Sequence, residues 1–90
     1  MIDNSERIVR IKQLLTDNLG ADSVEVIDES HKHAGHAGAK TGMGHFEVHI
    51  VAGAFEGKSL LERHRQVYDA LGDMMQTDIH ALSIKASTPQ

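Results

Sequence analysis

Residues 45–52 read HFEVHIVA and decide the architecture of this 90-residue chain. Every second residue from Phe46 to Ile50 is apolar, and the residues between them are polar or charged. Side chains alternate between the two faces of a strand, so this pattern indicates a β-strand that buries one face. His45 and His49 fall on the opposite face from Phe46, and we expect both to be exposed there.

A second strand and a helix precede this segment. Residues 23–29, SVEVIDE, are rich in β-branched side chains that favour a strand. Residues 4–19 fit a helix that Asp3 or Ser5 can cap and that Gly20 can end in a left-handed conformation. Apolar side chains recur at helical spacing on one face of this helix: Ile8, Ile11, Leu15 and Leu19.

A turn, a second helix and a third strand follow. Residues 53–57 form a glycine-bounded turn, after which Ser59 and Glu62 make a complete capping box for a helix. We expect Gly72 to weaken that helix late, by about 1 kcal/mol relative to alanine. Residues 81–86 alternate again and predict the last strand. The expected buried side of the second helix consists of Leu60, Leu61, His64, Val67, Tyr68, Leu71 and Met75.

The order helix, strand, strand, helix, strand predicts one α+β domain over residues 1–90. Both helices should cover one face of a three-stranded sheet. The first two strands should pair antiparallel, whereas the helix before the third strand permits a parallel connection. We therefore expect a mixed sheet.

Composition narrows the function. Without cysteine, neither a disulfide nor thiolate chemistry can come from this chain. The net charge is −4 with neutral histidines, which argues against indiscriminate binding of nucleic acid. No apolar run approaches the roughly 18 residues of a membrane span, and the N-terminal residues do not resemble a signal peptide. We expect a cytoplasmic protein with no membrane association.

Histidines concentrate in residues 31–44, HKHAGHAGAKTGMG, which hold three imidazoles and four glycines. Imidazole is the commonest metal ligand and changes charge near neutral pH. His80 opens the last strand-like run with the same parity as Leu82, so it is either a histidine at the edge of the core or a distant partner of this segment. The segment's own histidines could also simply be solvated. We expect function to centre here.

Four stretches resemble, in order and spacing, the BolA-like protein family. The resemblance extends over about residues 8–89 and implies a fold similar to the type II KH domain. It also implies partnership with a monothiol glutaredoxin, within which a [2Fe–2S] cluster is shared. The four stretches are VIDESHKHAGH (26–36), GHFEVHIV (44–51), FEGKSLLERHRQVYDAL (55–71) and IHALSIKAST (79–88).

The family resemblance also implies which residues bind the cluster. Ligands from the BolA-like partner are the histidine of the HAL motif, here His80, and a histidine or cysteine between the first two strands. His33 matches that second position best, and His36 competes with it. A glutaredoxin cysteine and glutathione supply the remaining ligands. Histidine can replace some thiolates in such clusters, so a chain without cysteine could take part only in a shared cluster, and none is expected on the isolated chain.

The alternative is a DNA-binding transcriptional regulator that uses the second helix and the turn at residues 77–80. Lys58, Arg63 and Arg65 would contact phosphates, or they could dock an acidic glutaredoxin surface, or they could be an ordinary solvated helix face. The sequence shows no arrangement of catalytic groups, so we expect no enzyme activity. We expect the isolated protein to be a monomer or a weak homodimer.

Overall fold

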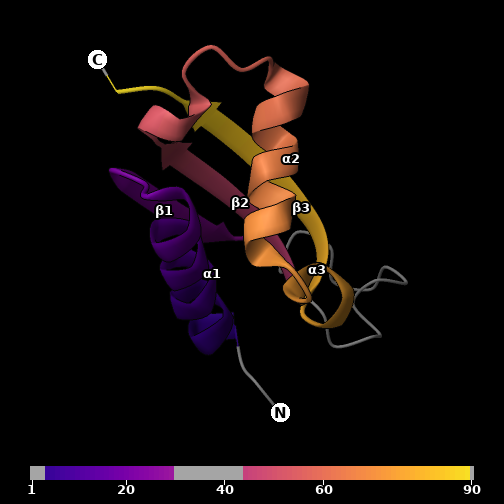
Figure 1. Ribbon diagram of the computed structural model, residues 1–90. Coiled ribbons are helices and arrows are strands. Elements are labelled where there is room, and N and C mark those ends of the chain that lie inside the picture. The colour runs from indigo at the N-terminus through magenta and orange to yellow at the C-terminus, as the bar shows by residue number, and fades with distance from the viewer. Residues whose placement is uncertain (1–3, 30–43, 90) are drawn as a thin grey trace.

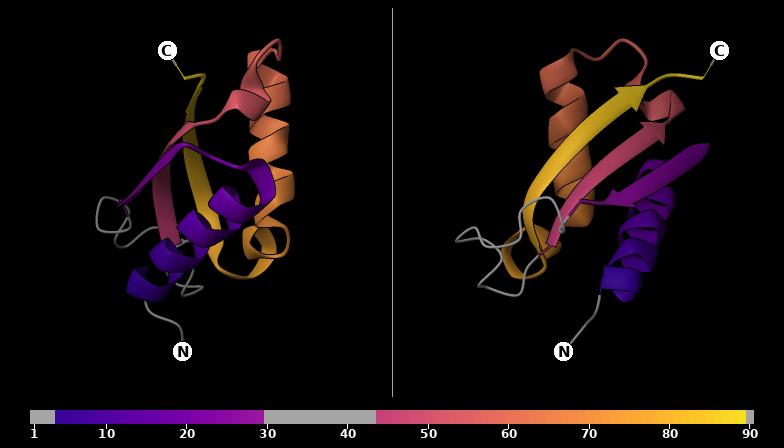
Figure 2. Two further views of the ribbon diagram at one scale, coloured as in Figure 1. Left: turned by 60° about the vertical axis from the view of Figure 1, so that its left-hand side comes forward. Right: turned by 180° about the vertical axis from the view of Figure 1, so that it is seen from behind.

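The computed structural model describes residues 4–29 and 44–89. A three-stranded sheet forms one layer, and helices cover one of its faces (Figure 1). Within the described residues the other face carries no helix, as the view from behind shows (Figure 2). In chain order the elements are α1 (Asn4–Leu19), β1 (Ser23–Asp28), β2 (Gly44–Val51), the 3-10 turn η3 (Gly53–Phe55), α2 (Leu60–Leu71), the short helix α3 (Met74–Thr77) and β3 (Ile79–Ser87).

The sheet has the strand order β1-β2-β3 and is mixed, as the sequence predicts. Strand β1 pairs antiparallel with β2, so that Val26 lies opposite Val48. Strand β3 pairs parallel with β2, so that Ile84 also lies opposite Val48. Strand β2 lies between the other two strands and supplies more buried core residues than either of them: Phe46, Val48 and Ile50. The helix between β2 and β3 makes the parallel pairing possible.

The core lies between the sheet and the two longer helices. Strand β2 buries the alternating residues that its pattern predicts, and helix α1 buries Ile11 and Leu15 against them. The turn after β2 adds Phe55, which is fully buried. Burial of an aliphatic or aromatic side chain contributes roughly 1.5–3 kcal/mol each. The core residues are Ile11, Leu15, Phe46, Val48, Ile50, Ala52, Phe55, Val67, Ala70, Leu71, Met74 and Ile79.

Helix α2 is shorter and buries fewer residues than the sequence predicts. It ends at Gly72, whose φ of 55° places it in the region that favours glycine, and α3 then follows as a separate turn. Leu60, Leu61 and Tyr68 are 64%, 60% and 40% exposed, so their predicted burial is wrong. Leu61 lies about 100° around the helix from the line of Val67 and Leu71, so the predicted apolar side was too wide there. Leu60 lies on that line but is the first residue of the helix, where it is exposed.

Candidate metal-ligand site

A β-bulge at the start of β3 places His80 at the surface. Gly44 pairs with Ile79, but the next residue of β2, His45, pairs with Ala81, which leaves His80 as an extra residue in β3. Ile79 is 1% exposed and points into the core, whereas His80 is exposed. Bulges of this kind re-aim side chains and recur next to functional sites. The core-edge reading, based on the shared parity of His80 and Leu82, is therefore wrong.

The imidazole of His45 lies beside that of His80. Their ring centroids are 5.0 Å apart, and the ring planes are inclined by 50°. His45 is only 8% exposed, so its expected exposure is also wrong, although the strand register does place it on the sheet face opposite the core. Sequence reasoning missed this pair because a bulge leaves no trace in the alternation that was used to assign faces. The structure thus brings together two imidazoles, one of them unexpected.

The other predicted ligands, His33 and His36, lie outside the described residues. Among residues 4–29 and 44–89, no three histidine, aspartate or glutamate side chains form a group that could hold a metal ion. The described part of the site therefore offers the His45–His80 pair. Imidazole nitrogens are ligands for zinc, copper, nickel and iron, and they can replace thiolates in iron–sulfur centres. His80, the exposed member of the pair, fits as a ligand of a cluster that is completed from another molecule.

A buried ion pair holds Asp78, two residues before His80. Arg7 of α1 donates from Nε to Oδ2 of Asp78 at 3.1 Å, and both residues are 8% exposed. The pKa of Asp78 lies below its ordinary value of 3.8, chiefly because the Thr77 hydroxyl donates a hydrogen bond to the carboxylate. The hydrogen bond from Arg7 lowers the pKa further, while burial opposes both effects. The carboxylate is therefore ionised at neutral pH.

A third histidine, His49, is engaged by carboxylates farther along the open face. Its Nε2 lies 2.7 Å from Oε2 of Glu47, and its Nδ1 lies 3.8 Å from Oε1 of Glu25 on the neighbouring strand. Its side chain is 37% exposed, as expected for a histidine on this face. Because both nitrogens face carboxylates, His49 differs in surroundings from His80 and provides a natural control for it.

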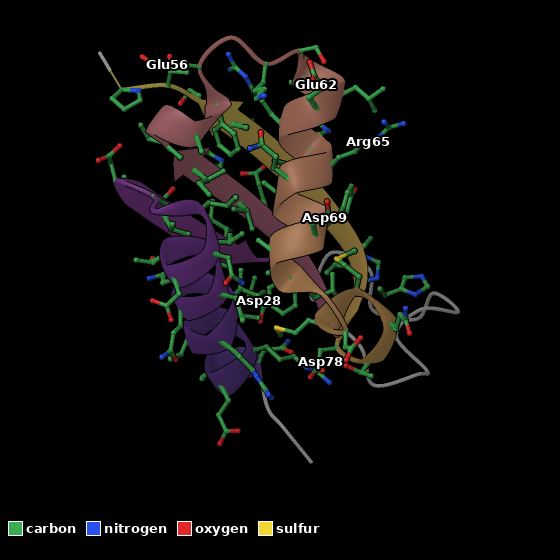
Figure 3. The ribbon with its side chains drawn as sticks, in the orientation of Figure 1. Asp28, Glu56, Glu62, Arg65, Asp69 and Asp78 are labelled. Carbon is green, nitrogen blue, oxygen red and sulfur yellow. The ribbon has the colours of Figure 1, made fainter. Side chains whose placement is uncertain are left out.

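The three predicted basic contact residues lie at the other end of the sheet and serve different roles. Arg63 donates to the carbonyl oxygens of Lys58 and Ala86, at 3.1 and 3.2 Å, so it ties α2 to β3. Lys58 and Arg65 are exposed, and their charges add only slightly to the lowering of the Glu62 pKa, which the backbone and side-chain hydrogen bonds of Ser59 chiefly cause. Figure 3 shows Arg65 and Glu62 at the end of α2 far from Asp78.

The separation between the basic end and the histidine end can be measured along β3. Ala86 is six positions after His80, which at about 3.3 Å per strand residue corresponds to roughly 20 Å. One partner can touch both ends only if its contact surface spans this length. A small ligand cannot do so.

These features define an α+β protein with an open sheet face and a bulge-exposed histidine at one end of it. The family model described as BolA-like protein matches residues 15–90. The chain belongs to the BolA-like family.

Relatives and solved structures agree with this assignment. The chain is 46% identical over 88 residues to SufE-like protein 1, chloroplastic/mitochondrial, of Arabidopsis thaliana, which covers 92% of this chain and 24% of that protein. It is 38% identical over 65 residues to the DNA-binding transcriptional regulator BolA of Escherichia coli, covering 72% of this chain and 59% of the regulator. The solved BolA domain of SufE1 from Arabidopsis thaliana superposes with a TM-score of 0.81 at 47% identity, covering 92% of each chain.

The chain spans from about a quarter to somewhat more than half of the curated relatives just named and of a plant BOLA1 protein. Within its described residues, none of its helices is both long and apolar enough to cross a membrane. The fold and the family are therefore shared with these relatives, and the activity of each whole protein belongs to that protein.

Proposed function

We propose that this chain is a non-catalytic adaptor that pairs with a monothiol glutaredoxin and completes a shared [2Fe–2S] cluster in iron–sulfur trafficking or iron and redox regulation. His80 supplies one ligand. The glutaredoxin cysteine and glutathione supply the thiolates that this chain lacks. The observation that carries the proposal is the bulge, which turns His80 out of the core and beside a second imidazole.

The second ligand comes from His33, His36 or His45. Family resemblance favours His33 or His36. His45 lies 5.0 Å from His80 between ring centroids, but both of its ring nitrogens are buried, so it ranks behind them. If two imidazoles share one ion at about 2.0–2.1 Å and a tetrahedral angle, their centroids lie about 5 Å apart, which matches the spacing of this pair. The cluster would supply electron transfer or iron delivery, and the chain's residues would hold it at the open end of the sheet.

Spectroscopy of the mixed proteins tests this function. When the wild-type chain is added to cluster-loaded monothiol glutaredoxin under anaerobic conditions, the visible absorption and circular dichroism spectra should change. His80→Ala should abolish the change, because the cluster loses an exposed ligand. His49→Ala, on the same face but engaged by carboxylates, should leave it intact. Single variants of His33, His36 and His45 then identify the second ligand.

Comparison of His80→Ala with the control variant His49→Ala decides whether His80 is a ligand. If His80→Ala and His49→Ala both behave like wild type, His80 is not a ligand and the proposal fails. A wild-type chain that leaves the glutaredoxin spectrum untouched would refute it as well. Analytical ultracentrifugation of the same mixtures reports whether a heterodimer forms, independently of any colour.

DNA binding is the second candidate, because the Escherichia coli relative at 38% identity carries that activity in its name. Of the three predicted contacts, Lys58 and Arg65 are exposed cations that could meet phosphates, while Arg63 is engaged by main-chain carbonyls. Two phosphate contacts would give a slope of about −2 in a plot of log affinity against log salt concentration.

Fluorescence anisotropy with a labelled duplex measures that slope. Removing Lys58 and Arg65 together should flatten it and weaken binding, while Lys12→Ala on α1 should change neither. An affinity that does not depend on salt, or that survives loss of both cations, would remove the α2 surface as the DNA contact.

A further inference from the structure

The first turn of α1 reaches the ends of two different strands. Asn4 donates from Nδ2 to Oδ2 of Asp28, the last residue of β1, at 2.9 Å. Arg7 donates from Nη1 to Oδ1 of Asn4 at 3.0 Å and from Nε to Asp78, immediately before β3. We call Asp28, Asn4, Arg7 and Asp78 the polar clamp. Figure 3 shows Asp28 and Asp78 at the end of the molecule where α1 begins.

The clamp meets β2 as well. The carbonyl of Asp78 accepts a hydrogen bond from the Gly44 amide at 2.9 Å. Gly44 also packs against α1: a methyl group added to it would lie 3.2 Å from Oδ1 of Asn4. Asp78 is thus held by its side chain from α1 and by its main chain from β2. This fixes the residue that precedes Ile79 and the bulge.

The fixed residues enclose His80 on both sides along the chain. Ile79 before it is anchored in the core, and Ala81 after it pairs with His45. Because Asp78 is held from both α1 and β2, a slip of the extra residue by one position along β2 would break these contacts. A one-residue slip would remove the bulge and return His80 to the core face. The clamp therefore sets both the exposure of His80 and its placement beside His45.

We propose that Asn4 and Arg7 are positioning residues that hold the His80 bulge, and thereby the His45–His80 imidazole pair, in the arrangement needed to bind metal. They act through Asp78 and Gly44. The metal-binding part of this inference rests on the proposed function, whereas the placement of the rings does not. Groups that orient metal ligands from outside the coordination sphere typically alter metal affinity by about 10–100-fold.

Nuclear magnetic resonance of the free protein tests the placement without any partner. In wild type, protons of the His45 and His80 rings should show a nuclear Overhauser effect. Arg7→Gln and Asn4→Ala should weaken or abolish it and shift the His80 amide resonance. Arg7→Lys, which keeps a charge for Asp78, should restore part of the signal, and Lys12→Ala on an exposed face of the same helix should leave it unchanged.

The same variants mixed with cluster-loaded glutaredoxin test the consequence for the metal. Arg7→Gln and Asn4→Ala should lose the cluster to a chelator about tenfold faster than wild type and Lys12→Ala do. If Arg7→Gln fails to fold, Asn4→Ala and Arg7→Lys decide, because both leave a positive charge beside Asp78.

The two measurements separate the inference from the function beneath it. Wild-type ring contacts and amide shifts in folded clamp variants would overturn the inference. Unchanged cluster loss in those variants would overturn its metal-binding part. If wild type itself fails to alter the glutaredoxin spectrum, the proposed function fails, and the ring contacts still decide whether the clamp places His80.

Discussion

At the scale of single residues, Gly44 is the most constrained backbone position of the site. A methyl group there would lie 2.5 Å from a ring carbon of Phe46, which is 2% exposed and packed in the core. The ring has no room to retreat, because protein interiors are packed as densely as organic crystals. Glycine is therefore required for space at this position, where β2 starts and meets Asp78.

Gly44→Ala should destabilise the fold by about 1–3 kcal/mol, as is typical when a packed core is overfilled. Gly53→Ala is the matched control, since a methyl group on Gly53 meets nothing within 4 Å. Urea denaturation followed by circular dichroism measures both free energies of unfolding. Equal stabilities for the two variants would show that the Phe46 ring moves aside easily.

At the scale of elements, the start of α2 follows the sequence closely. Ser59 accepts a hydrogen bond from the Glu62 amide at 3.2 Å, and the Glu62 carboxylate accepts one from the Ser59 amide at 3.0 Å. The pKa of Glu62 is lowered from 4.5, first because of the Ser59 backbone hydrogen bond and then because of the Ser59 side chain. Capping boxes are local, which explains why four residues suffice to predict this helix start.

This lowered pKa makes a contribution to stability that depends on pH. The unfolded chain binds the proton more tightly than the folded chain, so the contribution is complete above pH 4.5 and is lost as the pH falls through the folded pKa. Glu62→Gln preserves the capping box but does not titrate. The difference in unfolding free energy between wild type and Glu62→Gln should therefore shrink from pH 6 towards pH 3. A constant difference would contradict this assignment.

Two predictions from the sequence were wrong for physical reasons: the face of β3 on which His80 lies and the end of α2. Strand alternation placed His80 by counting back from Ile84, and one extra residue in β3 reverses that count. Asp78, two residues before the bulged His80, is held by Arg7, which lies 71 residues away in the chain. No local pattern reports such a contact. Likewise, Gly72 ends α2 through its φ of 55°, whereas helix propensity alone treats glycine as a modest cost.

At the scale of the whole molecule, the predicted element order, strand pairing and helix-covered face agree with the structure. The agreement arises because β2 alternates strictly and α1 has a clear apolar face, and both signals are local. The sequence was a poorer guide to which of the candidate site residues lie close together in space. The structure joins His80 to His45 and places Arg65 at the opposite end of the molecule from Asp78, which lies just before β3 (Figure 3). Such distances follow from tertiary packing alone.

The parallel pairing of β2 and β3 also governs when the imidazole pair can exist. Ribosomes deliver β2 first, then α2, and only afterwards the strand that carries His80. Until that strand has emerged and aligned beside β2, His45 has no neighbouring imidazole from it. A nascent chain that stalls within α2 therefore displays half of the pair. Any metal binding that used both rings would in this way be coupled to completion of the sheet during biosynthesis.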